Sequence, residues 1–389
     1  MSAARQLWQG FAATWRAIAG DAGVLMLLFI AGILYSFFYP LPYSRESVQQ
    51  VAVAVVDQDQ SALSRQITRF AAAHPALKLT QVTPDLPAAQ DLLWRGEIAG
   101  VLILPAGLQS QVLAGRAAAV EVAANGAYLV LNKAALNGFA EVVGTVSAGI
   151  ELKRLSAASP SAAQVAAQRQ PLNVNAVPLF NVREGYGAYV VPGVAVLIVQ
   201  QTLLMGIAML MGTWVERRAA PVAHTLAGYG GMLAAFASVG LLNSAYYFGF
   251  VLWWQDYPRG GNPAGLALLA VLYAFAVAAF GILIGTLFRT RERSMHLLIA
   301  SALPMLFLSG LAWPDQALPA LLRTARWLVP STAGIQGFIG VNQLGASLAE
   351  VAPEAGTLLA LLVASVLIGA WRWCRAAPPA SPDSSGEPA

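Results

Sequence analysis

Charged residues are scarce in this chain: Asp, Glu, Lys and Arg make up 11% of its 389 residues, whereas soluble proteins carry about a quarter. Hydrophobic residues make up 57%. The scarcity is uneven, because Tyr229–Trp254 and Ala264–Phe288 contain no charged residue at all. Both runs exceed the roughly 20 residues that a helix needs to cross a bilayer. The composition therefore excludes an ordinary soluble protein and indicates a membrane protein.

Cysteine and lysine are also rare. Cysteine occurs once, at Cys374, so no intrachain disulfide can form. Lysine occurs only at Lys78, Lys133 and Lys153, and the one short basic run is Arg289–Arg293, so the net charge of +4 does not indicate nucleic-acid binding. No GxSxG, HExxH or Cys/His cluster is present, and no GxxxxGK[ST] that would cradle nucleotide phosphates. We therefore expect no cofactor, metal or catalytic residue on this chain.

Six apolar runs predict six transmembrane helices: Gly23–Tyr39, Tyr189–Met211, Tyr229–Trp254, Ala264–Phe288, His296–Trp313 and Ala355–Trp371. A long polar stretch separates the first run from the other five. The first run has a cleaved signal peptide as its alternative, but no small-x-small cleavage site follows it. We interpret it as an uncleaved anchor.

The arginines near the span ends predict the orientation, because short cytoplasmic segments carry an excess of basic residues. With the N-terminus inside, the inside set is Arg5, Arg16, Arg217, Arg218, Arg289, Arg291, Arg293, Arg372 and Arg375. The outside set is Arg259, Arg323 and Arg326. Both termini are thus expected in the cytoplasm, and the chain is expected in a bacterial inner membrane.

The polar stretch has the pattern of a small α/β domain, with strands and helices in alternation. Strands are expected at Val51–Val56, Leu77–Val82, Ile98–Leu104 and Val120–Ala123, and helices at Ala62–Ala73, Pro87–Arg95, Leu108–Leu113 and Leu129–Leu155. Ser61 is the expected N-cap of the first helix. The predicted architecture is an N-terminus and first span (1–43), an extracytoplasmic α/β domain (44–185), a five-helix membrane domain (186–374) and a disordered cytoplasmic tail (375–389).

Two carboxylates follow the first predicted strand. Asp57 and Asp59 are a candidate metal or catalytic pair, but no histidine or further carboxylate lies nearby in the sequence. Asp at the end of a strand usually makes turn hydrogen bonds instead, and we favour that interpretation. His74 precedes Pro75 and is expected to be a surface residue.

Polar side chains inside the spans leave two interpretations open. Gln200 and Gln201 lie near the centre of the second span, and Asn243 and Tyr246 lie in the third. Buried polar groups in hydrocarbon either hydrogen-bond a neighbouring helix or face a water-filled path. These four residues are therefore candidates for a substrate path, with helix–helix contact as the alternative.

No Asp, Glu, Lys or Arg lies deep in any predicted span, which argues against a proton- or sodium-coupled carrier and favours an apolar or amphiphilic substrate. Pro304 and Ser309-Gly310 interrupt the fifth run. They predict a broken or re-entrant helix pair that ends in the amphipathic stretch Leu318–Val329 at the outer interface.

Four stretches of the chain resemble the ABC-type exporter permeases of the type-2 membrane class, in the subgroup with one span, a large extracytoplasmic domain and five further spans. They are VAVAVVDQDQSALSRQITRF (Val51–Phe70), LLWRGEIAGVLILPAGL (Leu92–Leu108), PLFNVREGYGAYVVPGVAVLIVQQTLLMGIAM (Pro178–Met209) and LSGLAWPDQALPALLRTARWLVPST (Leu308–Thr332). The sequence departs from the family after the second span, where its charged residues follow Gly212-Thr213 rather than precede them.

The resemblance implies a dimer of permeases, with a second copy or a paralogue, on two ABC ATPase subunits that carry ATP and Mg. It also places a coupling element in the inside loop Gly212–Gly228, where Trp214, Glu216, Arg217 and Arg218 are the candidate contacts; without the resemblance the loop is an ordinary positive-inside loop. Membrane lipid surrounds such a chain, and a periplasmic adaptor is a further candidate partner.

We therefore expect the permease subunit of an ATP-driven exporter for amphiphilic or drug-like substrates, and not an enzyme. The alternative is a membrane-anchored sensor or assembly scaffold whose outer domain binds a partner. A polytopic membrane enzyme is the third candidate, but it would need a polar or charged cluster that the sequence does not display.

Overall fold

The computed structural model describes residues 2–44, 49–158, 179–181 and 185–375. The chain divides into two compact units. One, which we call the helical unit, joins Met1–Ser44 to Pro178–Ala389, and the other, the α/β unit, is Arg45–Val177. Each buried hydrophobic cluster of the described residues belongs to one unit alone. Each unit therefore has a core of its own.

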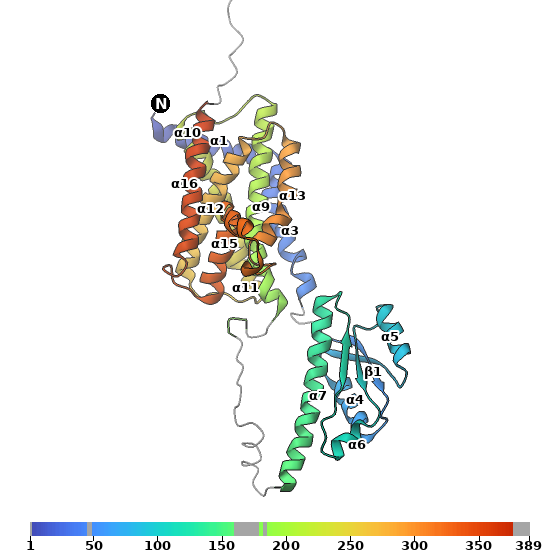
Figure 1. The fold of residues 1–389 in the computed structure, drawn as a ribbon. Coiled ribbons are helices and arrows are strands. Elements are labelled where there is room, and N and C mark those ends of the chain that lie inside the picture. The colour runs from blue at the N-terminus through green and yellow to red at the C-terminus, as the bar shows by residue number, and fades with distance from the viewer. Residues whose placement is uncertain (1, 45–48, 159–178, 182–184, 376–389) are drawn as a thin grey trace, which may run out of the picture. The chain divides into compact units, whose positions relative to one another are not determined.

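Long helices lie side by side in the helical unit (Figure 1). After α1 (Ala3–Ala19) comes a continuous helix, which we call the α2–α3 helix, made of α2 (Ala22–Leu25), a π-helical stretch (Met26–Ile30) and α3 (Ala31–Phe38). The later elements are α9 (Tyr186–Glu216), α10 (Leu226–Ser244) with a π-helical stretch (Ala245–Val251) and α11 (Leu252–Trp254), α12 (Pro263–Gly285), α13 (Arg291–Leu308), α14 (Ala320–Ala325), α15 (Pro330–Phe338) with a π-helical stretch (Ile339–Leu344), and α16 (Ala352–Arg375).

Five helices of the described residues are long and apolar enough to cross a membrane: Ala22–Tyr43, Tyr186–Glu216, Leu226–Trp254, Pro263–Gly285 and Ala352–Arg375. Each coincides with a predicted span. The remaining predicted span, His296–Trp313, falls on α13, which begins earlier, at Arg291, and ends earlier, at Leu308. Its first turn carries Arg291, Glu292 and Arg293, so α13 is not one of the five.

Helix α9 lies at the centre of the helical unit. Of the most apolar 18-residue stretch of α9, 83% is buried, whereas the buried share of the corresponding stretch is 28% in the α2–α3 helix and 22% in α16. It packs on the α2–α3 helix, α10, α12, α13 and α15. A helix that is apolar on all sides is stable only when it is surrounded, and this one has no charged residue between Tyr186 and Val215.

The segment after α13 turns back into the helical unit, in agreement with the predicted broken helix pair. Gly310 has a φ of +81°, a left-handed conformation that suits glycine. The Nε2 of Gln336 in α15 donates to the Ser309 carbonyl at 2.8 Å. The α15 helix is buried along most of its length and packs on α9, α12 and α16.

The α/β unit is a four-stranded sheet with helices on both faces (Figure 1). Its strands β1 (Val51–Asp57), β2 (Leu77–Thr83), β3 (Gly100–Leu104) and β4 (Glu121–Ala124) lie in the order β2-β1-β3-β4, and only β4 is antiparallel to its neighbour. Helices α4 (Ala62–Ala73), α6 (Leu108–Leu113) and α7 (Leu129–Ala158) share a core on one face, and α5 (Leu86–Trp94) packs on the other. Every strand and helix predicted for this region is present.

Candidate functional site

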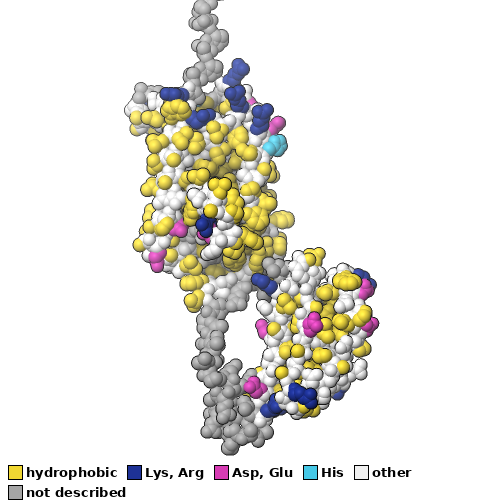
Figure 2. Space-filling view, in the orientation of Figure 1, with side chains coloured by type: hydrophobic (Ala, Val, Ile, Leu, Met, Phe, Trp, Pro, Cys, Tyr) yellow, Lys and Arg dark blue, Asp and Glu magenta, His cyan; other side chains and the backbone are white. Residues whose placement is uncertain are grey.

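One end of the helical unit carries α1 and the C-terminal turn of α16, and we call it the termini end. The α9–α10 loop (Arg217–Thr225) and the start of α13 also lie there. Figure 2 shows basic side chains gathered at this end, above a flank that is mostly hydrophobic; they are all arginines, because the three lysines belong to the α/β unit. The chain leaves the opposite end after Tyr43 and returns to it at Tyr186.

The α9–α10 loop is short because α9 continues past the predicted span end to Glu216. Arg217 caps the helix, and Arg218 adopts a left-handed φ of +50° that reverses the chain. Thr225 begins α10 as its N-cap, accepting a hydrogen bond from the Gly228 amide at 3.1 Å. The inside loop expected over Gly212–Gly228 is therefore shorter, because its first residues belong to α9 and its last to α10.

The α9–α10 loop is fastened to α16. His224 Nδ1 lies 2.9 Å from the Trp373 carbonyl oxygen, and the His224 ring stacks on the Trp373 indole with centroids 4.4 Å apart. The indole Nε1 donates to the Ala223 carbonyl at 3.2 Å. Movement of this loop therefore requires movement of the end of α16.

The four predicted coupling residues lie in different surroundings. Trp214 is only 7% exposed and packs inside the helical unit beside Trp373. Glu216, Arg217 and Arg218 are exposed. Trp214 is therefore a packing residue in this conformation, whereas the three charged residues are available at the surface.

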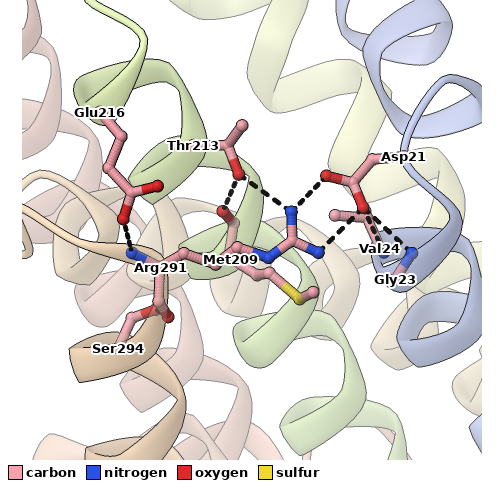
Figure 3. A network of polar contacts seen from close by, with 8 residues as sticks. All are labelled: Asp21, Gly23, Val24, Met209, Thr213, Glu216, Arg291 and Ser294. Atoms are coloured by element: carbon pink, nitrogen blue, oxygen red, sulfur yellow. Dashed lines mark hydrogen bonds and ion pairs between the residues drawn. The ribbon is translucent and has the colours of Figure 1, made fainter.

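Arg291 joins three helices at the termini end (Figure 3). Its guanidinium binds both carboxylate oxygens of Asp21, at the start of the α2–α3 helix, and donates to Thr213 Oγ1 of α9 at 3.1 Å. Its backbone amide donates to Glu216 Oε1 at 2.7 Å. The Glu216 carboxylate thereby caps the N-terminus of α13, where negative charge is favoured.

Asp21 is held as a carboxylate by these bonds. Its Oδ1 also accepts from the backbone amides of Gly23 and Val24 at 3.0 and 3.1 Å, which makes it the N-cap of the α2–α3 helix. The hydrogen bond from the Arg291 guanidinium is the main cause that lowers the pKa of Asp21, and it outweighs the opposing effect of burial. Asp21 is therefore ionised at neutral pH.

A cavity of about 700 Å³ lies beside the α9–α10 loop. The ends of α9, α12 and α16 form its walls, and Trp214 is part of them. Its cationic or titratable lining residues are Arg218, His224, Arg372 and Arg375, and its lining contains no carboxylate. The cavity is therefore a cationic site with aromatic walls.

The predicted path residues of the second span face α13. Gln200 is fully buried, and its Nε2 lies 3.4 Å from Met305 Sδ; the Nε2 of Gln201 lies 3.6 Å from the same sulfur. Their Oε1 atoms have no hydrogen-bond partner among the described residues. A thioether is a weak acceptor, so this pair is poorly satisfied in the present conformation.

The predicted path residues of the third span face the α2–α3 helix instead. Asn243 Nδ2 donates to the Leu28 carbonyl at 2.9 Å, and Tyr246 Oη lies 2.9 Å from Ser36 Oγ. Two more donors, Tyr247 Oη and Gln255 Nε2, bind the carbonyls of Gly32 and Ser36. Asn243 and Tyr246 thus make helix–helix contacts, and the structure does not bring them together with Gln200 and Gln201.

The carboxylates of the α/β unit serve local structure. Asp57 accepts hydrogen bonds from the amides of Asp59 and Gln60 and from Ser64 Oγ, at 2.8 to 3.1 Å. Asp59 accepts from the Gln109 amide at 3.0 Å, at the start of α6. No group of three or more His, Cys, Asp or Glu side chains in the described ranges could hold a metal ion. The favoured turn interpretation of Asp57 and Asp59 is supported.

His74 pairs with the Glu141 carboxylate of α7, with 2.9 Å between Nε2 and Oε2. His74 was expected to be a surface residue, but its side chain is only 16% exposed. Its partner Glu141 lies far along the chain and gave no local signal.

Several residues of the termini end were missed by sequence reasoning. The helix α1 was not predicted, although Gly10, Thr14 and Ile18 recur at helical spacing on its buried face. Asp21 directly precedes an apolar run, which is an N-cap signal that was available. Its pairing with Arg291, which lies in the other half of the chain, has no local signal.

Comparison with known proteins is consistent with this architecture. Residues 23–371 match the model of the family described as ABC-2 family transporter protein. The chain is 23% identical over 370 residues to the linearmycin resistance permease protein LnrN of Bacillus subtilis (strain 168), an alignment that covers 88% of this chain and 93% of that protein. The chain therefore belongs to the ABC-2 family of transporter proteins.

Proposed function

We propose that this chain is the membrane-spanning permease subunit of an ATP-driven exporter, which moves amphiphilic or drug-like compounds out of the cytoplasm or the inner membrane. The observation that carries the proposal is the family match, which extends from residue 23 to residue 371 and so takes in both units. A permease subunit transports, and no catalytic step is assigned to this chain.

The proposed topology has six spans, with α13 as the fifth. Its 18 residues give a helix of about 27 Å at 1.5 Å per residue, close to the thickness of the hydrocarbon core. It lies along α9, so it follows a spanning helix. With six spans both termini lie on one side, and the α/β unit, inserted between the first two spans, lies on the other.

The distribution of charge supports a cytoplasmic termini end. Arg16, Arg217, Arg289 and Arg293 are among the exposed basic side chains there. At the opposite end Arg259 pairs with Asp256 and Arg326 pairs with Asp315, so part of the basic charge is neutralised. An excess of basic residues is typical of the cytoplasmic side. In a bacterial inner membrane the α/β unit would then lie outside, where a periplasmic adaptor would contact it.

A separate ABC ATPase would supply the energy, and it would bind ATP and Mg on its own chain. We assign its contact to the exposed residues of the α9–α10 loop, Arg217 and Arg218, together with Glu216. Because Glu216 also caps α13 and the loop is fastened to α16, a push on this loop would reach both helices. A second permease copy or a paralogue would complete the dimer.

The substrate class rests on two observations. The relative from Bacillus subtilis is a linearmycin resistance permease protein, which suggests export of a toxic compound here as well. The spans lack charged residues at depth, so a permanently charged solute would find no counter-charge there. The poorly satisfied amides of Gln200 and Gln201, beside α13, remain our candidates for polar contacts with such a substrate.

Purification of the tagged chain from its native membrane tests the proposal. A P-loop ATPase should be retained, and amphiphiles should stimulate its hydrolysis of ATP. The variant Arg217→Glu should lose the ATPase, whereas Arg293→Glu, an exposed reversal at the same end, should keep it. A solitary oligomer with no ATPase would favour the sensor or scaffold alternative.

A further inference from the structure

The cavity at the termini end holds more positive charge than the proposed ATPase contact at Arg217 and Arg218 accounts for. Arg218 and Arg375 line it, and neither forms an ion pair with a carboxylate in the part of the chain that the structure describes. Arg372 is partly engaged, since its Nε and Nη2 donate to Thr286 Oγ1 and to the Thr286 carbonyl at 2.9 and 3.1 Å. With no carboxylate in the lining, the cavity has unmatched positive charge.

Aromatic side chains form much of the wall around these cations. Trp214 and Trp373 are 7% and 6% exposed, whereas Trp371 is 54% exposed. The Arg375 guanidinium lies over the Trp371 ring, 4.4 Å from its centroid, which fixes the direction of this flexible side chain. Tryptophan indoles are enriched at the level of lipid headgroups, so a lining with three of them suits a cavity at that depth.

An exposed apolar stripe on α16 leads to the cavity. Val363, Leu367, Trp371 and Arg375 recur every fourth residue and therefore share one face of the helix. The first three are 48%, 66% and 54% exposed. The stripe passes from aliphatic side chains through an indole to a guanidinium, the same order as acyl chain, interface and phosphate in a phospholipid.

We propose that this cavity binds an anionic phospholipid of the cytoplasmic leaflet, with its phosphate at Arg218 and Arg375 and an acyl chain along Val363 and Leu367. Guanidinium groups bind phosphate oxygens with paired hydrogen bonds. An acidic protein segment would satisfy the arginines but would leave the stripe on α16 without a partner, so we favour the lipid. The choice of leaflet rests on the proposed sidedness of the helical unit, but the lipid site does not depend on ATP-driven export.

A bound lipid would sit beside the α9–α10 loop, because Arg218 belongs to that loop and Arg375 to α16. It would add a second connection between the two elements, next to the one made by His224 and Trp373. The anionic lipid content of the membrane would then influence the position of the loop.

Native mass spectrometry of the purified chain in detergent tests the proposal, with phosphatidylglycerol and phosphatidylcholine as the probes. The wild-type chain should retain phosphatidylglycerol in preference. Arg218→Gln with Arg375→Gln should weaken that binding by roughly 25-fold, because each basic residue contributes about 1 kcal/mol, or about fivefold. Arg289→Gln with Arg293→Gln removes the same charge at the same end, outside the cavity, and should change binding less than twofold.

Three further measurements keep the outcome clear. The double variant Arg218→Gln with Arg375→Gln, the cavity variant, should have the thermal unfolding midpoint of wild type, which shows that it is folded. The variant Leu367→Asn, which keeps both arginines, should weaken the binding of phosphatidylglycerol. Millimolar inorganic phosphate should not displace the lipid; if it does, the cavity is a soluble-anion site and the proposal fails. The proposal also fails if the wild-type chain retains the two lipids equally. It fails as well if the cavity variant loses the ATPase but keeps its preference for phosphatidylglycerol.

Discussion

Single side chains connect the helices of the termini end, and Arg291 connects the most. Its guanidinium binds Asp21, the N-cap of the α2–α3 helix, and Thr213 of α9, and its backbone amide donates to the Glu216 carboxylate. Asp21 and Arg291 have side-chain exposures of 16% and 30%, so water screens this pair less than a pair on the open surface.

The variant Asp21→Asn should destabilise the helical unit by about 1.5–3 kcal/mol, the usual contribution of a hydrogen bond to a charged group. The reason is that the half-buried Arg291 guanidinium then loses its carboxylate partner. The unfolding midpoint of the purified protein in detergent measures the effect. Asp256→Asn, which alters a more exposed ion pair of the same unit, is the control, and an equal loss in both variants would contradict the assigned role.

Asp59 gives a prediction for the α/β unit. The variant Asp59→Ala should cost about 0.5–2 kcal/mol, the range for loss of a helix cap, because its carboxylate accepts from the first turn of α6. Asp85→Ala is the matched control, since Asp85 precedes α5 but makes no side-chain cap bond. Urea unfolding of residues 49–158 measures the difference.

The same variant has a pH signature. Burial raises the pKa of Asp59, but hydrogen bonds from Ser61 and from the amides of residues 107–109 outweigh it and lower the pKa below its usual value. Because the pKa of Asp59 is lower in the folded than in the unfolded state, its carboxylate stabilises the fold at any pH above the unfolded pKa of about 3.9. This stabilisation is lost as the pH falls through the folded-state pKa. The difference in free energy of unfolding between wild type and Asp59→Ala should therefore be constant near neutral pH and shrink below about pH 4. A difference that stays constant below pH 4 would contradict this role of Asp59.

At the scale of elements, α1 is held against α10 by close backbone contact. A Cβ at Gly10 would lie 2.7 Å from the Gly228 carbonyl oxygen, and one at Gly231 would meet the Leu7 carbonyl and lie 2.7 Å from the Phe11 nitrogen. Both contacts involve backbone atoms, which cannot rotate away. Glycine is therefore required where the two helices cross.

The variant Gly231→Ala should displace α1 from α10, because its added methyl group overlaps the backbone of α1. Gly230→Ala is the neighbouring control, since its Cβ would meet only Leu7 Cδ1, at 3.9 Å. Limited proteolysis of the purified protein should cut α1 several-fold faster in the first variant than in the second. Equal rates would show that α1 is held by other contacts.

Most elements could be predicted from the sequence, and the failures have physical causes. In the α/β unit, capping and turn residues mark the boundaries, as Ser61 does for α4 and Gly96 for the end of α5. In the helical unit, apolar runs mark the helices but not their ends, because α9 continues as a helix beyond the hydrocarbon-length run to Glu216. Trp214 therefore lies inside the helical unit, although the sequence suggested a loop.

The candidate site was less predictable than the fold. The α9–α10 loop could be located from its charges, but its attachment to Trp373 and the Asp21–Arg291 pair depend on contacts between distant parts of the chain. Asn243 and Tyr246 show the same difficulty. A polar residue in a span has equal reason to bind a helix or a substrate, and only its neighbours distinguish the two.

At the scale of the whole molecule, sidedness decides the function. Cys374 is a natural probe because it is exposed at the termini end and is the single cysteine of the chain. A membrane-impermeant maleimide should label it only after spheroplasts are opened. In a Cys374→Ser background, Gln90→Cys on the exposed side of α5 should be labelled in intact spheroplasts. The opposite pattern would invert the topology and remove the basis for export.

The hydrogen bonds between the α2–α3 helix and the third apolar helix have a consequence for motion. Donors from Asn243, Tyr247 and Gln255 bind carbonyls at three depths, so the two helices should travel as one rigid body. Inside the helical unit, the apolar part of α13 meets α9 through the weak amide–sulfur bonds at Met305, whereas its first residue, Arg291, is bound to Thr213 and Glu216 at the end of α9. Any movement of α13 against α9 should therefore pivot about Arg291 and be largest near Met305.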